Sequence, residues 1–414
     1  MWPRAGLLAG LALVAAGGTA DAAGAAAAGG AQAASTASST CWLKGWPHAA
    51  RCGVLQRPLD PARPQGVQID IHYAVVPALA RNKAPDAVFF FAGGPGQSAI
   101  DLAGALAAMH GRLQQRRDLV FVDQRGTGRS APLACPDDDA RAQLQPQALQ
   151  DDSAQRLLRL QACRQALQAL PYGDLRFYTT DIAMADVEAV RLALAIPRIN
   201  AIGASYGSRA VLSYQRQFAQ VLRRAVLDGV VPPDMRLPEA AAVDNQAAWD
   251  ALLKACAADA DCAHHHPDLA TRLPTLLAGL PRSVQLPHPV TGRLETVVLR
   301  ADTVLAMVRA PLYSPALAAA LPAVLAEAAA GRWAPLAALA RALGGGGGAG
   351  GIASGQHFSV VCAEDLGPGA PLASTTPAAP GVFAGVFAGS AVALYQEVCA
   401  TWPRGVVSPA FYTL

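Results

Sequence analysis

Charged side chains are scarce in this sequence of 414 residues. Asp, Glu, Lys and Arg together make up 15% of the chain, 52% is hydrophobic, and the formal net charge is only +3. So few charges exclude a disordered polyelectrolyte. So small a net charge gives no electrostatic basis for binding a nucleic acid or an acidic membrane surface. The length instead predicts a large hydrophobic core with an inserted subdomain.

The N-terminus lacks an apolar run long enough to span a bilayer. Arg4 precedes an apolar stretch at 5–18 that is too short for a stable anchor, and Ala-Asp-Ala at 20–22 matches a signal-peptide cleavage site. We therefore predict a signal peptide at residues 1–22, a secreted or periplasmic protein, and no membrane association after cleavage. The alternative, a buried N-terminal helix, is disfavoured by the Gly and Ala residues that follow. Residues 23–40 are rich in Ala, Gly, Ser and Thr, which predicts a disordered linker.

Cysteines are few, and no cluster of metal ligands accompanies them. Only Cys262 with the three histidines at 264–266 approaches a ligand set, and no second cluster supports a site there, so we predict no metal. In an exported chain, eight cysteines that fall in sequence-local pairs predict four disulfides. The pairs are Cys41 with Cys52, Cys135 with Cys163, Cys256 with Cys262, and Cys362 with Cys399.

Hydrophobic patterning from residue 41 to 230 predicts an α/β fold. Alternation from Val67 to Val75 indicates a half-buried strand. Short continuous apolar runs then indicate strands buried on both faces, as in a parallel sheet covered by helices. They lie at 87–92, 119–123, 199–204 and 225–228, and helical stretches such as 181–195 separate the later ones. We expect a doubly wound, mostly parallel α/β sheet.

The pattern changes from residue 231 onward. Residues 239–343 are rich in Ala and Leu, helical in period and broken by prolines, which predicts a helical lid at 231–400 inserted into the sheet. The glycine tract 344–351 is expected to be a flexible connector. Residues 401–414 are expected to begin the return to the core.

The pentapeptide Gly203-Ala204-Ser205-Tyr206-Gly207 matches G-x-S-x-G between an apolar strand and a helix. That context is typical of the nucleophile elbow, in which glycines allow a tight turn and the serine is exposed. The helix N-terminus behind Ser205 favours negative charge there. A tight glycine turn with an uninvolved serine is the alternative.

A glycine-rich loop, Gly93-Gly94-Pro95-Gly96, follows the predicted strand 87–92. An acyl-transfer enzyme needs two donors aimed at the tetrahedral oxyanion, and we assign them to the backbone N–H groups of Gly94 and Tyr206. A simple strand-ending turn is the alternative for this loop.

The segment 123–130, after the next predicted strand, begins with Asp123 and contains Arg125. Its charges are expected to form a buried network that braces the oxyanion loop. Its lone G-x-G does not complete a dinucleotide-binding fingerprint.

Together these segments resemble the prolyl and tripeptidyl aminopeptidase family of secreted α/β hydrolase serine peptidases. One departure is Ala92, where many prolyl aminopeptidases have a histidine. The resemblance rests on GGPG (93–96), DQRGTGRS (123–130), GASYGS (203–208), AVLDGV (225–230), FSVVCAED (358–365) and WPRG (402–405). It implies hydrolysis of peptides that have a free N-terminus, through an acyl-enzyme and without a cofactor. By the same resemblance, Glu364, with Asp365 second, would hold the substrate ammonium; ordinary lid carboxylates are the alternative.

The acid and base of a triad are missing after Ser205. The resemblance implies an Asp after a late core strand and a His near the C-terminus, and neither motif is present before Leu414. The histidines at 264–266, His288 and His357, which leads into a predicted strand at 358–365, are poor substitutes. We therefore expect a C-terminally truncated and inactive fragment without the last core strands. An esterase and a peptide-binding pseudoenzyme are the alternative functions, and the sequence does not indicate an oligomeric state.

Overall fold

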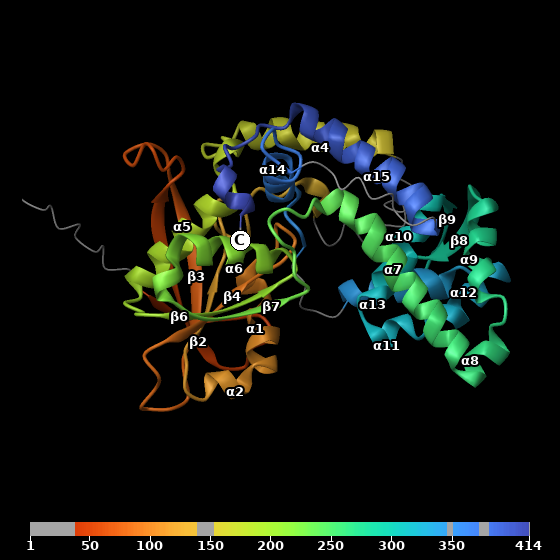
Figure 1. Cartoon of the computed structure of the whole chain (residues 1–414), viewed down its shortest axis with the longest axis horizontal. Helices are drawn as coiled ribbons and strands as arrows, with labels where there is room; N and C mark the ends of the chain where they lie inside the picture. The colour runs from red at the N-terminus through yellow and green to blue at the C-terminus, as the bar shows by residue number, and fades with distance from the viewer. Residues whose placement is uncertain (1–37, 139–152, 346–350, 372–380, 414) are drawn as a thin grey trace, which may run out of the picture. The chain divides into compact units, whose positions relative to one another are not determined.

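The computed structural model describes residues 38–138, 153–345, 351–371 and 381–413 (Figure 1). The predicted signal peptide at 1–22, the linker up to residue 37 and residues 346–350 of the predicted connector lie outside the described residues. Among the described helices, none combines the length and the apolar character needed to cross a membrane.

A seven-stranded mixed sheet forms the core, in the order β1-β2-β3-β5-β4-β6-β7. Its strands are β1 (Ser39–Trp42), β2 (Ala49–Pro58), β3 (Gln68–Val76), β4 (Ala87–Phe91), β5 (Leu119–Val122), β6 (Ile199–Ala204) and β7 (Leu222–Asp228). Strands β5, β4, β6 and β7 run parallel to one another. Beyond β5, the sheet continues with β3, β2 and β1, each paired antiparallel to its neighbour. The predicted α/β hydrolase fold is confirmed.

Helices cover both faces of this sheet, as the unbroken apolar strands require. Every residue of β4 and β5 is buried. One hydrophobic cluster includes side chains of α4 (Ser153–Gln168), α5 (Thr180–Ala193) and α6 (Tyr206–Phe218). A second cluster, on alternate residues of the same strands, includes α1 (Ala99–Met109), which is followed by α2 (Gly111–Gln114).

The prediction that residues 225–228 are buried on both faces is wrong. Val226 is 53% exposed, and all residues of β7 are exposed or half-buried. The physical reason is position, since β7 is at the edge of the described sheet and pairs there with β6 alone. An apolar run does not reveal which strand lies at an edge.

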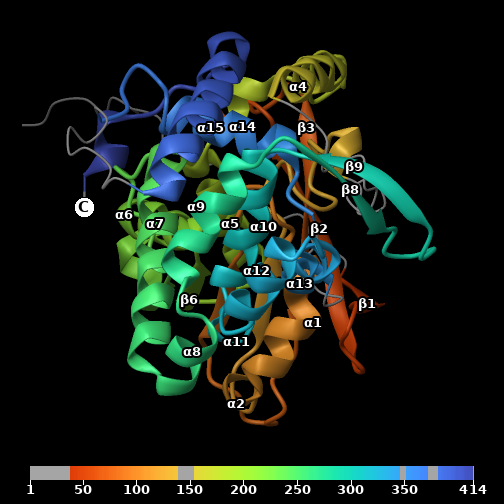
Figure 2. The ribbon, with the colours of Figure 1, turned by 90° about the vertical axis from the view of Figure 1, so that its right-hand side faces the viewer.

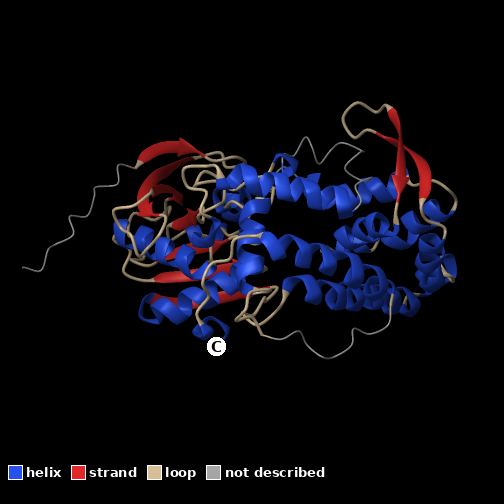
Figure 3. Ribbon diagram, turned by 90° about the horizontal axis from the view of Figure 1, so that it is seen from above, coloured by secondary structure: helices blue, strands red, loops and turns tan. Residues whose placement is uncertain are grey.

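The segment after β7 is mainly helical and has a hydrophobic core of its own around Trp249, Leu273 and Val308. Its elements are α7 (Leu237–Ala258), α8 (Ala260–His265), α9 (Leu269–Ala278), β8 (Arg282–Pro287), β9 (Leu294–Leu299), α10 (Ala301–Leu312), α11 (Pro315–Ala318), α12 (Leu321–Ala329) and α13 (Ala334–Gly345). The antiparallel hairpin β8–β9 was not predicted (Figure 2). Figure 3 shows it as a group of strands separate from the main sheet.

The predicted strand at 358–365 is wrong, because these residues belong to helix α14 (Ser354–Glu364). A continuous apolar run fits a buried helix as well as a buried strand, and α14 is buried over most of its surface. α14 and the C-terminal part of α15 (Val382–Thr401) pack into the cluster that includes α4, α5 and α6. The domain boundaries at 230, 231 and 400 remain predictions.

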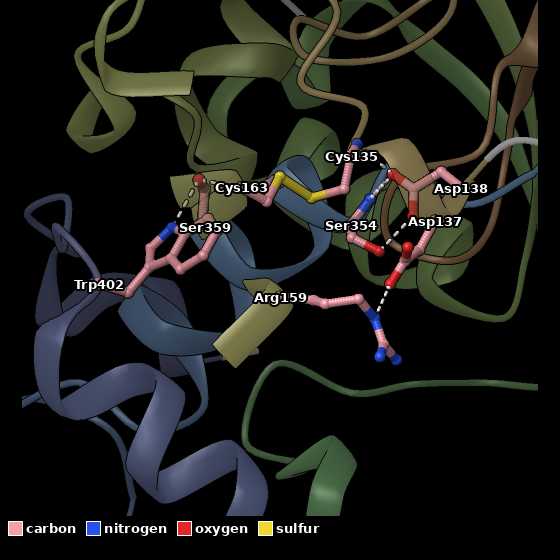
Figure 4. Close-up of a disulfide and its surroundings, with 9 residues drawn as sticks. Cys135, Asp137, Asp138, Arg159, Cys163, Ser354, Ser359 and Trp402 are labelled. Atoms are coloured by element: carbon pink, nitrogen blue, oxygen red, sulfur yellow. Dashed lines mark hydrogen bonds and ion pairs between the residues drawn. A yellow bond between two sulfur atoms is a disulfide. The ribbon is translucent and has the colours of Figure 1, made fainter. Parts of the chain in front are cut away.

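All eight cysteines form disulfides, in the four predicted pairs. Figure 4 shows the pair Cys135–Cys163, which ties the segment after β5 to α4. Cys362–Cys399 joins α14 to α15. Disulfides persist in oxidising compartments, so the chain has the cysteine chemistry of an exported protein.

Removing the Cys135–Cys163 disulfide should destabilise the chain more than removing Cys256–Cys262. The first pair is separated by 28 residues and the second by 6, and the entropy that a cross-link removes from the unfolded chain grows with loop length. Replacing both cysteines of a pair by alanine should lower the free energy of unfolding by about 3–4 kcal/mol for the first pair and about 2 kcal/mol for the second. Urea unfolding measures both values, and equal losses would contradict the loop-length argument.

Candidate active site

Ser205 occupies a strained turn between β6 and α6. Its φ of 56° and ψ of −129° are unusual for a residue with a side chain, and its backbone N–H donates to the Asp228 carbonyl at 2.8 Å. Glycine is required two residues later, because a Cβ at Gly207 would come within 2.0 Å of the Phe91 carbonyl oxygen. The turn leaves Ser205 exposed, in the conformation that a nucleophile elbow has.

The loop Gly93-Gly94-Pro95-Gly96 lies directly beside Ser205. A Cβ built at Gly93 would be 3.3 Å from the Cβ of Ser205. The loop leads into α1, whose N-cap residue Ser98 accepts a hydrogen bond from the Asp101 N–H. The structure thus brings together three of the predicted site residues, Ser205, Tyr206 and the loop with Gly94.

Asp123 is buried, as the sequence predicts, and it holds the start of α1, which follows this loop. It is 1% exposed and accepts hydrogen bonds from Ser98 Oγ at 2.7 Å and from the Ile100 N–H at 3.0 Å, at the start of α1. Burial raises the pKa of Asp123, and these hydrogen bonds oppose the rise. Arg125 also lies in a buried charge network, as predicted, but that network does not brace this loop. Its guanidinium pairs with Asp186 at 2.7 Å and contacts backbone carbonyls outside the loop.

Glu364 and Asp365 lie at the C-terminal end of α14, and each is 1% exposed. Both face the fully buried Arg209 of α6, with Arg209 Nη1 at 2.5 Å from Asp365 Oδ1 and 3.7 Å from Glu364 Oε2. Asp365 also accepts from the Leu237 N–H at 3.0 Å, at the start of α7. The two carboxylates are therefore not lid surface residues, because one buried guanidinium holds them to the helix that follows the elbow.

Glu364 is also linked to Tyr206. It accepts from the Thr180 N–H at 2.7 Å and from Thr180 Oγ1 at 2.9 Å, and Thr180 Oγ1 is 2.6 Å from the Tyr206 hydroxyl. The backbone carbonyl of Glu364 accepts from the Tyr412 hydroxyl at 2.7 Å. This contact between α5, α6 and α14 cannot be read from the sequence, since 184 residues separate Thr180 from Glu364.

Burial changes the acid–base properties of this cluster. It raises the pKa of Glu364 to about 7, although Arg209 and the hydrogen bonds from Thr180 oppose the rise. Burial also raises the pKa of Asp365, although the Arg209 guanidinium opposes this rise. The Tyr206 hydroxyl, buried beside Glu364, has a pKa above its usual range. Glu364 therefore titrates near neutral pH.

Histidines do not reach the nucleophile in this structure. All eight lie in described parts of the chain, and none of them forms a hydrogen bond with Ser205. A cavity of about 560 Å³, lined by residues from 59–67, 168–177 and Pro403, does not include Ser205 either. Among the described residues, no group of three His, Cys, Asp or Glu side chains could hold a metal ion.

Replacing Glu364 by Gln should flatten the pH dependence of stability. The folded chain retains the Glu364 proton up to about pH 7, whereas the unfolded chain loses it near the ordinary pKa of 4.5. The free energy of unfolding should therefore fall as the pH rises through this window, by at most about 3 kcal/mol. In E364Q most of this decrease in the free energy of unfolding should be absent, and the remainder should come from Asp365 and its neighbours.

Urea-unfolding midpoints between about pH 5 and pH 8 test this prediction. The control is Glu327→Gln, which removes an exposed carboxylate paired with Arg332 and should keep the wild-type slope. Parallel slopes for wild type and E364Q would contradict a raised pKa at this position.

Comparison with known proteins agrees with this geometry. A family model described as the alpha/beta hydrolase fold matches residues 86–263. The serine protease Hip1 of Mycobacterium tuberculosis is 30% identical over 228 residues, which cover 52% of this chain and 43% of that protein. Tripeptidyl aminopeptidase of Streptomyces lividans is 29% identical over 197 residues, which cover 45% and 36%.

A third relative, carboxylesterase B of M. tuberculosis, is 37% identical over 92 residues, which cover 22% of this chain and 17% of that protein. The aligned part thus spans less than half the length of each of these curated relatives. The resemblance that the motifs predicted is confirmed: the chain has the α/β hydrolase fold and is similar to relatives named as a serine protease and a tripeptidyl aminopeptidase.

Proposed function

We propose that this chain is a serine exopeptidase, an aminopeptidase of the prolyl or tripeptidyl type, that works through an acyl-enzyme on Ser205. The observation that carries the proposal is the exposed Ser205 in a strained elbow, beside a glycine loop. The relatives named as a serine protease and a tripeptidyl aminopeptidase support peptides as substrates. The disulfides support export, with residues 1–22 as the proposed signal peptide.

In the proposed reaction, Ser205 Oγ attacks the carbonyl carbon of the scissile bond. The hydroxyl proton passes to a base and then to the leaving amine, so that an ester forms as the peptide bond breaks. Water then hydrolyses the ester and regenerates the serine. The N–H groups of Gly94 and Tyr206 are the proposed donors to the oxyanion, and Tyr206 is suited to this because it is the first residue of α6. Residues 41–230 would form the catalytic core and residues 231–400 the lid.

Glu364, with Asp365, is the proposed partner of the substrate ammonium group. The support is the balance of charge in the cluster. With Glu239 of α7 as a third carboxylate, the acidic side chains outnumber the two guanidinium groups of Arg209 and Arg236. An excess of carboxylates over guanidinium groups attracts a cation once Glu364 has lost its proton. A ligand ammonium would enter a cluster whose internal hydrogen bonds already support α6.

Ser205 needs a base to take its proton. Since no histidine of the chain hydrogen bonds with Ser205, we propose that Ser205 in this chain is weakly activated and turns over substrate slowly. An elbow and an oxyanion loop serve ester hydrolysis equally well, and the carboxylesterase relative favours an esterase as the second candidate. If Ser205 has no reactivity at all, a peptide-binding pseudoenzyme is the remaining candidate.

A fluorophosphonate probe tests Ser205 as the nucleophile. The wild-type chain should label slowly, and added imidazole should accelerate the labelling, because it supplies the base that no histidine of the chain provides. Ser205→Ala should abolish labelling, and Ser283→Ala, at an exposed serine of β8, should not change it. Fast labelling at a rate that does not depend on added imidazole would mean that an in-chain histidine acts as the base.

Replacing Glu364 by Ala tests the ammonium site. With imidazole present, hydrolysis of a tripeptidyl anilide with a free N-terminus should fall at least about tenfold, because a charge-assisted hydrogen bond is lost. The N-acetylated anilide and a simple ester carry no ammonium group, and their hydrolysis should fall much less. An equal loss on all three substrates would reject this role and leave Glu364 as a support of α6.

A further inference from the structure

His357, in the first turn of α14, is a part-buried side chain that the proposed reaction does not use. Its Nδ1 lies 3.3 Å from the Pro95 carbonyl oxygen, and its Nε2 lies 2.7 Å from the Tyr395 hydroxyl. A carbonyl oxygen can only accept, so Nδ1 carries the proton. Nε2 then accepts from Tyr395, and both ring nitrogens of the neutral imidazole are occupied.

The ring is neutral at ordinary pH. Burial lowers the pKa of His357 to about 4, and the hydrogen bond to Pro95 only partly offsets that effect. Tyr395, whose own pKa burial raises, remains a hydroxyl donor. With one nitrogen donating and the other accepting, this histidine is not free to take a proton from Ser205.

A second contact from the same part of the chain holds the same loop. The Ala353 N–H, just before α14, donates to the Gly96 carbonyl oxygen at 3.0 Å. Gly96 has a φ of +112°, and a Cβ there would lie 2.8 Å from the Ala353 carbonyl oxygen. Two successive carbonyls of the oxyanion loop, those of Pro95 and Gly96, are therefore tied to the start of α14.

The start of α14 is itself firmly anchored. The Ser354 N–H and hydroxyl both donate to Asp138, and the Gly355 N–H donates to the Leu133 carbonyl at 2.9 Å. Figure 4 shows Ser354 and Asp138 beside the disulfide of Cys135. Further along α14, Cys362 is bonded to Cys399 of α15, the helix that carries Tyr395.

We propose that His357, held by Tyr395, is a positioning residue that fixes the oxyanion loop through the Pro95 carbonyl and so aims the Gly94 N–H at the oxyanion that forms beside Ser205. The inference rests on the proposed function, because it assigns a purpose to the loop beside the nucleophile. His357 does not touch the substrate. It acts by keeping the loop in one conformation before substrate arrives, which is the condition for an effective oxyanion hole.

Isosteric variants separate the two bonds of the imidazole. An asparagine amide nitrogen can take the place of Nδ1, and a glutamine amide group can take the place of Nε2. His357→Asn should therefore keep the bond to Pro95, whereas His357→Gln and His357→Ala should lose it. The matched control is His110→Ala, since His110 is also part-buried and bonded to a backbone carbonyl, that of Leu106, but does not contact the loop.

Hydrogen exchange read by mass spectrometry reports on the loop without any turnover. Peptides covering residues 91–98 should exchange faster in H357A and H357Q than in wild type, and at nearly the wild-type rate in H357N and H110A.

Fluorophosphonate labelling at a fixed imidazole concentration reports on the reactivity of Ser205. In H357A and H357Q, kinact should fall about 10- to 100-fold with KI unchanged. Misplaced N–H donors would stabilise the transition state less without changing how the probe binds.

Unchanged exchange in H357A would overturn the proposal. So would equal effects of the Asn, Gln and Ala variants, or a loss in H110A as large as that in H357A, because each would indicate general destabilisation. If the wild-type chain does not label even with imidazole, the proposed function fails, and the exchange rates of residues 91–98 alone decide the role of His357.

Discussion

The buried guanidinium of Arg209 is the interaction on which the arrangement around Ser205 depends. A charge that is fully removed from water must be paired, and Arg209 is paired only because Asp365 and Glu364 reach it from α14. It lies one turn along α6 from the nucleophile. The direction of α6, the end of α14 and, through the Leu237 N–H, the start of α7 are thus determined by one site of charge compensation.

α14 contacts both sides of the proposed oxyanion hole. Its first turn holds the carbonyl of Pro95, the residue before it holds that of Gly96, and its last residue reaches Tyr206 through Thr180. Helix α14 therefore connects the two segments that carry the proposed donors. The buried faces of this helix are nearly continuous, which explains why its sequence lacks the polar alternation of a surface helix.

Local patterns predicted the elbow and the glycine loop, because strand, turn and helix signals are neighbours in the chain. Sequence could not predict the partners of Glu364, since a buried carboxylate beside Arg209 depends on contacts between distant segments. The run at 358–365 fits a strand and a helix equally, and packing decided for the helix. Arg125 was associated with the wrong loop because its partner Asp186 lies on α5. The disulfide pairs were predictable, because each joins cysteines close in sequence.

The exposed side of β7 gives the main sheet an open margin. Its outer backbone N–H and C=O groups have no strand partner among the described residues, and Val226 and Val230 expose apolar surface beside them. An unprotected margin of this kind is a template for backbone pairing with any extended polypeptide that can match its register. The sheet can therefore grow by one strand without disturbing an existing pair, and that strand would lie on the side of β7 opposite β6 and Ser205, whose N–H is bonded to the last carbonyl of β7.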